Sequence, residues 1–395
     1  MRSPNVATTI ALCFAVAVLE GYDIQAIGVA APRLAPEFGL GREAMGWIFS
    51  ISNIGLVIGA ALGGWLADRV GRKPVFIAAV ATFGAFTLAT ALAESFQILF
   101  AVRLCAGLGF GAALPNMMAM AAELSSPDKR AFTAATMFSG LPLGGGTSAL
   151  LTQVLPPDFD WRILFVVGGV LPLLLIPALH ALMPETLPPS ERGARQHSVA
   201  SVEALFGGGR AMPTLLLWLA FLPTLLILYL ILNWLPTLVV AKGLDRVVAP
   251  QASLAFNFAS VAGALLFGRM VDKLGPRGPL AFAYGALIVS LVALGASTQL
   301  TMILLLSGAA GFFLMGANYS LYGVAASYYP PNVRGTGSGA SVAVGRIGSI
   351  AGPMLAGILL GGGATATNVV QYMAPVAAVA GIAVVVLTFF RHADG

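Results

Sequence analysis

The stretch that decides the fold is GWLADRVGRK, residues 64–73, a short charged segment between two long apolar runs. Its glycines allow helices to approach closely and accommodate a tight connection. A weaker copy, GRMVDKLG, occupies residues 268–275. The two copies place Asp68 and Asp272 at equivalent positions, 204 residues apart. A charged loop that occurs twice predicts two related helical halves.

The composition around this loop excludes a soluble globular protein. Of the 395 residues, 58% are hydrophobic and 9% are charged, whereas about a quarter of an ordinary soluble domain is charged. A transmembrane helix needs about 20 apolar residues, so the chain can hold twelve spans joined by short loops. We therefore expect a multi-pass protein in a lipid bilayer. The net charge of +5 reflects membrane topology in such a protein, and no nucleic-acid partner is expected.

Apolar runs between charged residues and prolines predict six spans in each half of the chain. The spans lie near residues 7–31, 44–67, 74–93, 96–122, 131–155, 162–183, 212–240, 247–271, 279–298, 300–328, 335–361 and 367–390. Residues 1–183 and 212–395 would form two six-helix bundles, with residues 184–211 as a cytoplasmic linker. Lys and Arg concentrate in the loops on the side of the termini, which predicts that both termini are cytoplasmic.

A shift of 204 residues aligns further features of the two halves. The coincident pairs are Gly59 and Gly263, Gly107 and Gly311, Pro127 and Pro331, Arg130 and Arg334, and Gly144 and Gly348. Coincidences of charged residues and prolines at one constant offset indicate an internal repeat rather than chance. Parallel repeats of six spans, with the substrate site at their interface, are a plan used by secondary transporters.

The charges deep in the spans do not repeat. Under the same shift Glu20, Asp23 and Arg103 correspond to Thr224, Ile227 and Ser307, and Arg346 corresponds to Pro142. Charges that the scaffold needs should tend to occur in both halves, whereas charges that serve a substrate or a coupling ion need occur only once. The four unrepeated charges are therefore candidates for function.

Glu20 and Asp23 are three residues apart in the first span and share one helix face. Arg103 reaches a similar depth in the fourth span, so the acids and Arg103 are expected partners. A charge at the bilayer centre costs at least about 2.5–3.5 kcal/mol on insertion scales. Burial favours the protonated form of a carboxylate, whereas a nearby arginine favours the ionised form. Movement of Arg103 would switch protonation, which indicates proton coupling; a static buried salt bridge is the alternative.

Arg346 lies inside the eleventh span, and a guanidinium suits a bidentate grip on a carboxylate. We expect it to bind the anionic group of the substrate; a pairing with Glu20 or Asp23 is the alternative. Polar and aromatic residues within the spans are further candidates for substrate contacts, although such residues more often serve helix packing. They are Tyr22, Asn116, Trp234, Asn257, Asn318 and Tyr319. The three asparagines are the preferred candidates for binding a substrate hydroxyl.

The charged loop between the second and third spans is expected to act as a cytoplasmic gate. Asp68 can meet the N-terminus of a neighbouring helix or Arg130, and Glu123 would assist beside Arg130. A loop that only sets topology is the alternative. The predicted gate residues are Asp68, Arg69, Arg72, Glu123, Arg130, Asp272 and Arg334.

Several segments together resemble the aromatic acid:proton symporters of the major facilitator superfamily. They are EGYD at residues 20–23, RLCAGLGFGAALPN at residues 103–116, and the stretch from RGTG at residues 334–337 to Pro353, while residues 64–73 resemble the superfamily loop motif GxLaDrxGrk. Residues 45–50, 111–116, 233–236 and 342–346 are similar to segments of 3-(3-hydroxyphenyl)propionate transporters. The resemblance implies the all-α major facilitator fold. The family's first-span motif is DGxD, with an acidic residue needed for transport, and Glu20 stands at its first position.

Together these features predict proton-coupled uptake of an aromatic carboxylate, such as a hydroxyphenylpropionate or hydroxybenzoate, across the bacterial inner membrane by alternating access. Protons would be the coupling ion, with no cofactor or metal, and a monomer is expected. An efflux antiporter of organic acids or drugs would use the same acid–arginine machinery. A membrane sensor of aromatic acids is an alternative of a different class. An enzyme is not expected, because the sequence offers no nucleophile, metal or cofactor constellation.

Overall fold

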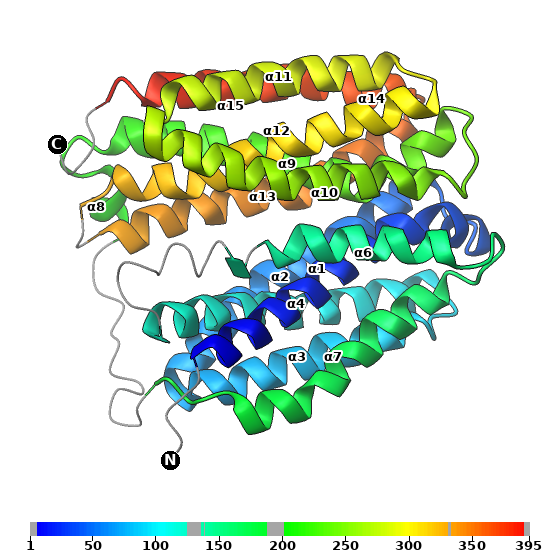
Figure 1. The fold of residues 1–395 in the computed structure, drawn as a ribbon, viewed down its shortest axis with the longest axis horizontal. Helices are drawn as coiled ribbons and strands as arrows, with labels where there is room; N and C mark the ends of the chain where they lie inside the picture. The colour runs from blue at the N-terminus through cyan, green and yellow to red at the C-terminus, as the bar shows by residue number, and fades with distance from the viewer. Residues whose placement is uncertain (1–5, 125–135, 138, 188–200, 331–332, 391–395) are drawn as a thin grey trace. The chain divides into compact units, whose positions relative to one another are not determined.

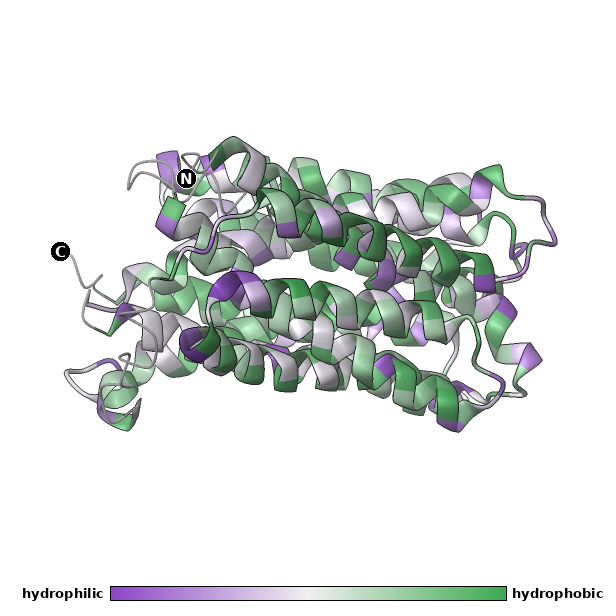
Figure 2. Cartoon of the chain, turned by 90° about the horizontal axis from the view of Figure 1, so that it is seen from below, coloured by the Kyte–Doolittle hydropathy of each residue, from purple (hydrophilic) through white to green (hydrophobic). Residues whose placement is uncertain are grey.

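A computed structural model of the protein describes residues 6–124, 136–137, 139–187, 201–330 and 333–390. All the regular elements in these ranges are helices. Eleven candidate spans, by length and composition, lie within the described part of the chain. Figure 2 shows hydrophobic residues along the helices and hydrophilic ones mainly at helix ends and in connections. The chain is an all-helical, multi-pass membrane protein, as predicted.

The chain divides into two compact units. The first comprises residues 1–40 and 51–197, and the second comprises residues 41–50 and 198–395. The helices of the first unit are α1 (Val6–Glu37), α2 (Arg42–Val70, whose first residues belong to the second unit), α3 (Arg72–Thr90), α4 (Phe96–Leu124), α6 (Gly140–Val154) and α7 (Arg162–Leu182). Those of the second are α8 (Ser201–Phe206), α9 (Ala211–Ala241), α10 (Ala249–Leu274), α11 (Arg277–Ala296), α12 (Leu300–Ser327), α13 (Arg334–Gly361), α14 (Ala366–Gln371) and α15 (Met373–Leu387).

Packing within each unit follows the same scheme. In the first unit α1 packs on α6, and α3 packs on α4 and α7; in the second, α9 packs on α13, and α11 packs on α12 and α15. Figure 1 shows α3 beside α7, and α11 beside α15. The 204-residue shift that relates the two halves of the sequence relates these helix pairs as well. The predicted fifth span is described in part, as α6.

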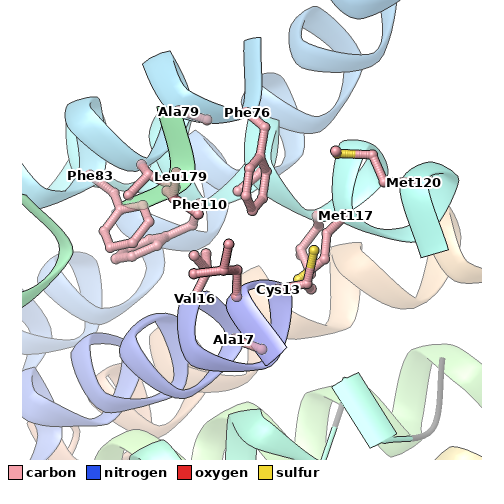
Figure 3. Close-up of a cluster of buried hydrophobic side chains, with 14 of the residues drawn as sticks. Cys13, Val16, Ala17, Phe76, Ala79, Phe83, Phe110, Met117, Met120 and Leu179 are labelled. Carbon is pink, nitrogen blue, oxygen red and sulfur yellow. The ribbon is translucent and has the colours of Figure 1, made fainter. Parts of the chain in front are cut away.

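The core of the first unit is an apolar cluster contributed by several of its helices. Figure 3 shows Cys13 and Val16 of α1 facing Phe76 and Phe83 of α3 and Phe110 of α4. The Phe83 and Phe110 rings are 4.8 Å apart between centroids. Each of these side chains is at most 1% exposed. Close packing of this kind sets the spacing at which the helices present their polar residues.

Glycines bring helices into close contact at equivalent places in both units. A Cβ atom on Gly59 would collide with the carbonyl oxygen of Leu108, and one on Gly263 would collide with that of Phe312. The pairs Gly107 with Ser52 and Gly311 with Phe256, and Gly144 with Val18 and Gly348 with Leu222, make the same contact. Because both partners in each pair are related by the same shift, the internal repeat extends to the closest contacts between helices.

The first helix is longer than its predicted span. The predicted span ends near residue 31, whereas α1 continues through Pro32 and Pro36 to Glu37. Contacts from the start of α7 hold this end in place. Trp161 Nε1 donates to Glu37 Oε2 at 2.6 Å, and Arg162 Nη2 lies 2.7 Å from Glu37 Oε1.

Candidate functional site

A buried ion pair joins α1 to α4 in the first unit. Arg103 Nη1 donates to Asp23 Oδ1 at 3.0 Å, and Arg103 Nη2 lies 2.8 Å from Asp23 Oδ2. Both side chains are 0% exposed. Arg103 Nε also donates to Ser52 Oγ of α2 at 3.1 Å. The guanidinium of Arg103 therefore contacts a carboxylate of α1 and a hydroxyl of α2.

Glycine packing explains how Ser52 reaches Arg103. A Cβ on Gly107, one helical turn after Arg103, would collide with the carbonyl oxygen of Ser52. A Cβ on Gly55 would collide with the carbonyl oxygen of Leu104. The two glycines therefore hold α2 and α4 in close contact at the level of the ion pair.

Glu20 lies on the same face of α1 as Asp23 and is 1% exposed. Tyr22, predicted to contact substrate, donates its hydroxyl to the carbonyl of Leu164 at 3.0 Å. Its ring packs against Gly168 of α7. The described contacts of Tyr22 therefore tie α1 to α7.

In the second unit, Arg346 of α13 meets a tyrosine of α9. Arg346 Nη1 donates to the hydroxyl oxygen of Tyr229 at 2.8 Å. A third helix, α12, places Tyr322 near Arg346 and Tyr229. The Tyr322 ring stands edge-on to Phe221 of α9, with centroids 5.3 Å apart. Arg346 thus lies in an aromatic environment, and Tyr229 is a residue that the sequence reading missed.

Three other residues predicted to contact substrate form hydrogen bonds within their own unit. Asn116 donates to the carbonyl of Ala112 at 2.8 Å, and Asn257 donates to that of Ser253 at 2.7 Å. These carbonyls lie one turn back on the same helix, so each bond engages an amide N–H group. The Oδ1 atom of Asn116 is buried and has no hydrogen-bond partner among the described residues. Trp234 Nε1 donates to the carbonyl of Pro353 at 2.8 Å and joins α9 to α13.

Two predicted substrate contacts lie on α12. The rings of Tyr319 and Tyr322 are 6.4 Å apart between centroids. Asn318 is 4% exposed. Tyr319 therefore adjoins the aromatic group around Arg346, and Asn318 is the next residue back along the same helix.

The loop between α2 and α3 forms a charge network centred on Arg72. Its Nε donates to Glu123 Oε1 at 3.0 Å and to Oε2 at 3.1 Å, and its Nη2 lies 3.9 Å from Asp68 Oδ1. The backbone N–H of Arg72 donates to Glu185 Oε1 at 2.9 Å. The carboxylate that accepts this hydrogen bond at the N-terminus of α3 is therefore that of Glu185.

Glu123, which was expected to lie beside Arg130, pairs with Arg72. Arg130 itself lies outside the described residues. Glu185 was assigned to the linker, although its position directly after Pro184 at the end of a span was a signal that it could reach the loop. The described contacts of two other predicted gate residues lie elsewhere. Arg69 lies over the Trp65 ring at 3.8 Å, and Arg334 donates to the carbonyl of Tyr329 at 3.2 Å. Asp272 is exposed.

A helical membrane protein with repeated units and charges buried between their helices has the design of a transporter. A model of the Major Facilitator Superfamily matches residues 13–353 and 252–394. The chain belongs to this superfamily, which confirms the predicted resemblance and the expectation of a transporter rather than an enzyme.

Characterised relatives are similar over nearly their whole length. The 3-(3-hydroxy-phenyl)propionate transporter of Escherichia coli (strain K12) is 41% identical over 385 residues, which cover 98% of this chain and 94% of the relative. The gallate transporter of Pseudomonas putida is 34% identical, with 88% and 84% covered. The 4-hydroxybenzoate transporter PcaK of the same species is 33% identical, with 97% and 92% covered. These relatives are named for small aromatic acids.

Solved structures share the fold at lower identity. The crystal structure of a bacterial homolog to the human lysosomal transporter Spinster, in an inward-facing and occupied conformation, has a TM-score of 0.78 to this chain. Its sequence is 18% identical, and the match covers 98% of this chain and 97% of that one. At this identity the likeness establishes the fold alone.

Proposed function

We propose that the protein is a symporter, which carries an aromatic carboxylate and protons together across the bacterial inner membrane by alternating access. The relatives named for hydroxyphenylpropionate, gallate and hydroxybenzoate support the substrate class. We further propose twelve spans with both termini cytoplasmic, a monomeric state, and protons as coupling ion without a cofactor.

The observation that carries the proposal is the ion pair of Asp23 and Arg103. Two full charges removed from water persist only when they are paired in good geometry. Protonation of Asp23 would weaken its attraction for Arg103 and free the guanidinium to move. Glu20, which is buried on the same face of α1 as Asp23, would also take up and release protons. Proton binding would then be coupled to the packing of α1 against α4.

Arg346 would hold the carboxylate of the substrate. Its guanidinium is positioned by α9 and α13 of the second unit, and the neighbouring Tyr322 and Phe221 rings suit an aromatic ligand. The predicted contacts Asn116, Asn257, Asn318, Tyr319, Trp234 and Tyr22 would line the path of the substrate. The network of Asp68, Arg72 and Glu123 would close the cytoplasmic side, assisted by Arg69, Arg130, Asp272 and Arg334.

Uptake into proteoliposomes tests the coupling. An inward proton gradient should accelerate uptake of labelled 3-(3-hydroxyphenyl)propionate or 4-hydroxybenzoate, and Asp23→Asn should abolish this acceleration. Asp245→Asn, which alters an exposed acid in the connection between α9 and α10, serves as the matched control and should keep it. Uptake that responds to neither the gradient nor Asp23→Asn would reject coupling, and proton flux opposite to substrate flux would assign exchange instead.

The role of Arg346 has its own test. Arg346→Lys keeps the charge but loses the planar fork, so the apparent KM should rise by at least about tenfold. Transport with an unchanged KM would rule out the substrate role of Arg346 while leaving the coupling proposal intact.

A further inference from the structure

Tyr229 is placed where it can touch whatever Arg346 binds. Its hydroxyl oxygen accepts a hydrogen bond from Arg346 Nη1 at 2.8 Å, and its side chain is 8% exposed. It belongs to α9, whereas Arg346 belongs to α13. The contact therefore depends on how closely the two helices approach.

Glycines of α13 set that approach. A Cβ on Gly348 would collide with the carbonyl oxygen of Leu222, and a Cβ on Gly352 would collide with that of Leu226. Tyr229 is held at its own backbone, where Asn233 donates to its carbonyl at 2.7 Å. The phenol and the guanidinium are thus presented by rigid, closely packed helices.

The repeat indicates that this contact is not part of the shared scaffold. The positions equivalent to Tyr229 and Arg346 in the first half are Gln25 and Pro142. Neither can reproduce an arginine–phenol bond, although the glycine contact between the same two helices is present in both units. The helix packing is therefore maintained without the pair, and the pair calls for a different explanation.

The chemistry of the pair defines an anion site. Arginine is only a donor, whereas a phenol is both a donor and an acceptor. Because the Tyr229 oxygen accepts from Arg346, its O–H hydrogen is directed away from the guanidinium. A carboxylate beside both groups could accept an N–H bond on one oxygen and the Tyr229 O–H bond on the other.

We propose that Tyr229 contacts the carboxylate of the aromatic substrate together with Arg346 and thereby determines selectivity for acids over their neutral amides. This inference rests on the proposed function, because it takes the substrate to be an aromatic carboxylate bound by Arg346. An amide has one acceptor oxygen, and its NH2 group would face the Tyr229 donor. The mismatch would leave buried polar groups unpaired, which is a strong source of discrimination.

The test compares binding of 3-(3-hydroxyphenyl)propionate and its amide by the purified full-length protein in detergent. Tyr229→Phe should weaken binding of the acid by about tenfold, as expected for one hydrogen bond to a charged group. Binding of the amide should change little, so the ratio of acid to amide affinity falls. Tyr284→Phe is the matched control, because it also removes a buried hydroxyl that bonds to α9, at Thr224. It should leave the ratio at the wild-type value.

A second comparison separates direct contact from mere positioning of Arg346. In the Arg346→Lys variant a lysine ammonium replaces the planar guanidinium, so Tyr229 has no planar group to orient. Tyr229→Phe should still lower affinity for the acid there, whereas a purely positioning role predicts no further loss. An unchanged acid affinity in this background, or an equal loss for acid and amide in the parent, overturns the inference. If Arg346→Lys itself binds the acid as tightly as wild type, the proposed role of Arg346 fails instead.

Discussion

The two units hold the charges within their spans on different pairs of helices. In the first unit a carboxylate on α1 meets a guanidinium on α4. In the second unit the equivalent positions on α9 and α12 are Ile227 and Ser307, and the guanidinium on α13 meets a phenol on α9 instead. Among the described contacts, the first unit therefore has a buried ion pair at this site, and the second has a hydrogen bond between a cation and a neutral phenol.

The scaffold around these groups is the same in both units. Helices approach through glycines at equivalent positions, and even the colliding carbonyls are related by the 204-residue shift. The comparison teaches that duplication maintained the packing while the polar residues diverged. Such divergence is expected if one unit handles a titrating pair and the other an anionic ligand, as we propose above.

The largest expected effect comes from breaking the ion pair. Asp23→Asn leaves the Arg103 guanidinium buried without its counter-charge, which should cost roughly 3–5 kcal/mol in the free energy of unfolding. Arg346→Gln in the second unit loses the hydrogen bond of a charged donor to a neutral hydroxyl and should cost less, about 1.5–3 kcal/mol. Denaturant unfolding of the purified variants measures both.

A double variant sharpens this first prediction. Asp23→Asn combined with Arg103→Gln removes both charges, and should recover part of the stability lost in Asp23→Asn alone. Equal costs for Asp23→Asn and Arg346→Gln would contradict the contrast between the two units.

The next prediction concerns what the units share. Gly144→Ala and Gly348→Ala place a methyl group against the carbonyls of Val18 and Leu222. Each should destabilise the protein by at least about 1–3 kcal/mol, because the two helix backbones must separate. The thermal shift of the two variants should be similar despite the different charges nearby.

Gly308→Ala is the control for these two variants. Its Cβ would lie 3.6 Å from its nearest neighbour, the carbonyl oxygen of Ala255, an ordinary contact. The gain in helix propensity over glycine should leave this variant as stable as wild type or slightly more stable. A large loss for only one of Gly144→Ala and Gly348→Ala would contradict an equivalent scaffold.

The scaffold could be predicted from the sequence because its signals are long or repeated. Apolar runs define the spans, and one constant offset aligns Gly144 with Gly348. The partnership of Asp23 with Arg103 also followed from depth alone, because isolated charges in a membrane must find each other. These arguments need no knowledge of side-chain orientation.

The other contacts of the candidate site could not be predicted, because they depend on tertiary packing that no local sequence pattern indicates. Tyr229 sits in a uniformly apolar run, and only the approach of α9 to α13 brings it to Arg346. Glu185 follows a span, and only folding brings it to the N-terminus of α3. Asn116 and Asn257 were predicted as ligand contacts, and the described hydrogen bonds of their amide N–H groups go to carbonyls one turn back on their own helices.

The smallest expected effect distinguishes the two copies of the charged loop. In the first copy Arg72, whose side chain is 6% exposed, pairs with Glu123. In the second, Pro276 and Ser327 occupy the positions of Arg72 and Glu123, and the neighbouring Arg277 lies over the exposed Phe389 ring at 4.3 Å. A retained aspartate, Asp272, therefore does not recreate the network of the first loop.

Arg72→Gln should cost about 1 kcal/mol, because Glu123 is partly exposed to solvent and its pairing is screened. Arg277→Gln should cost about 0.5 kcal/mol or less, as expected for a cation–π contact at an exposed site. The difference should shrink when unfolding is measured in high salt, since screening weakens the ion pairs of the first loop more. In uptake assays Arg72→Gln should slow transport and Arg277→Gln should not. If the two variants slow transport equally, the second loop is as important for gating as the first, and the asymmetry inferred from these contacts is wrong.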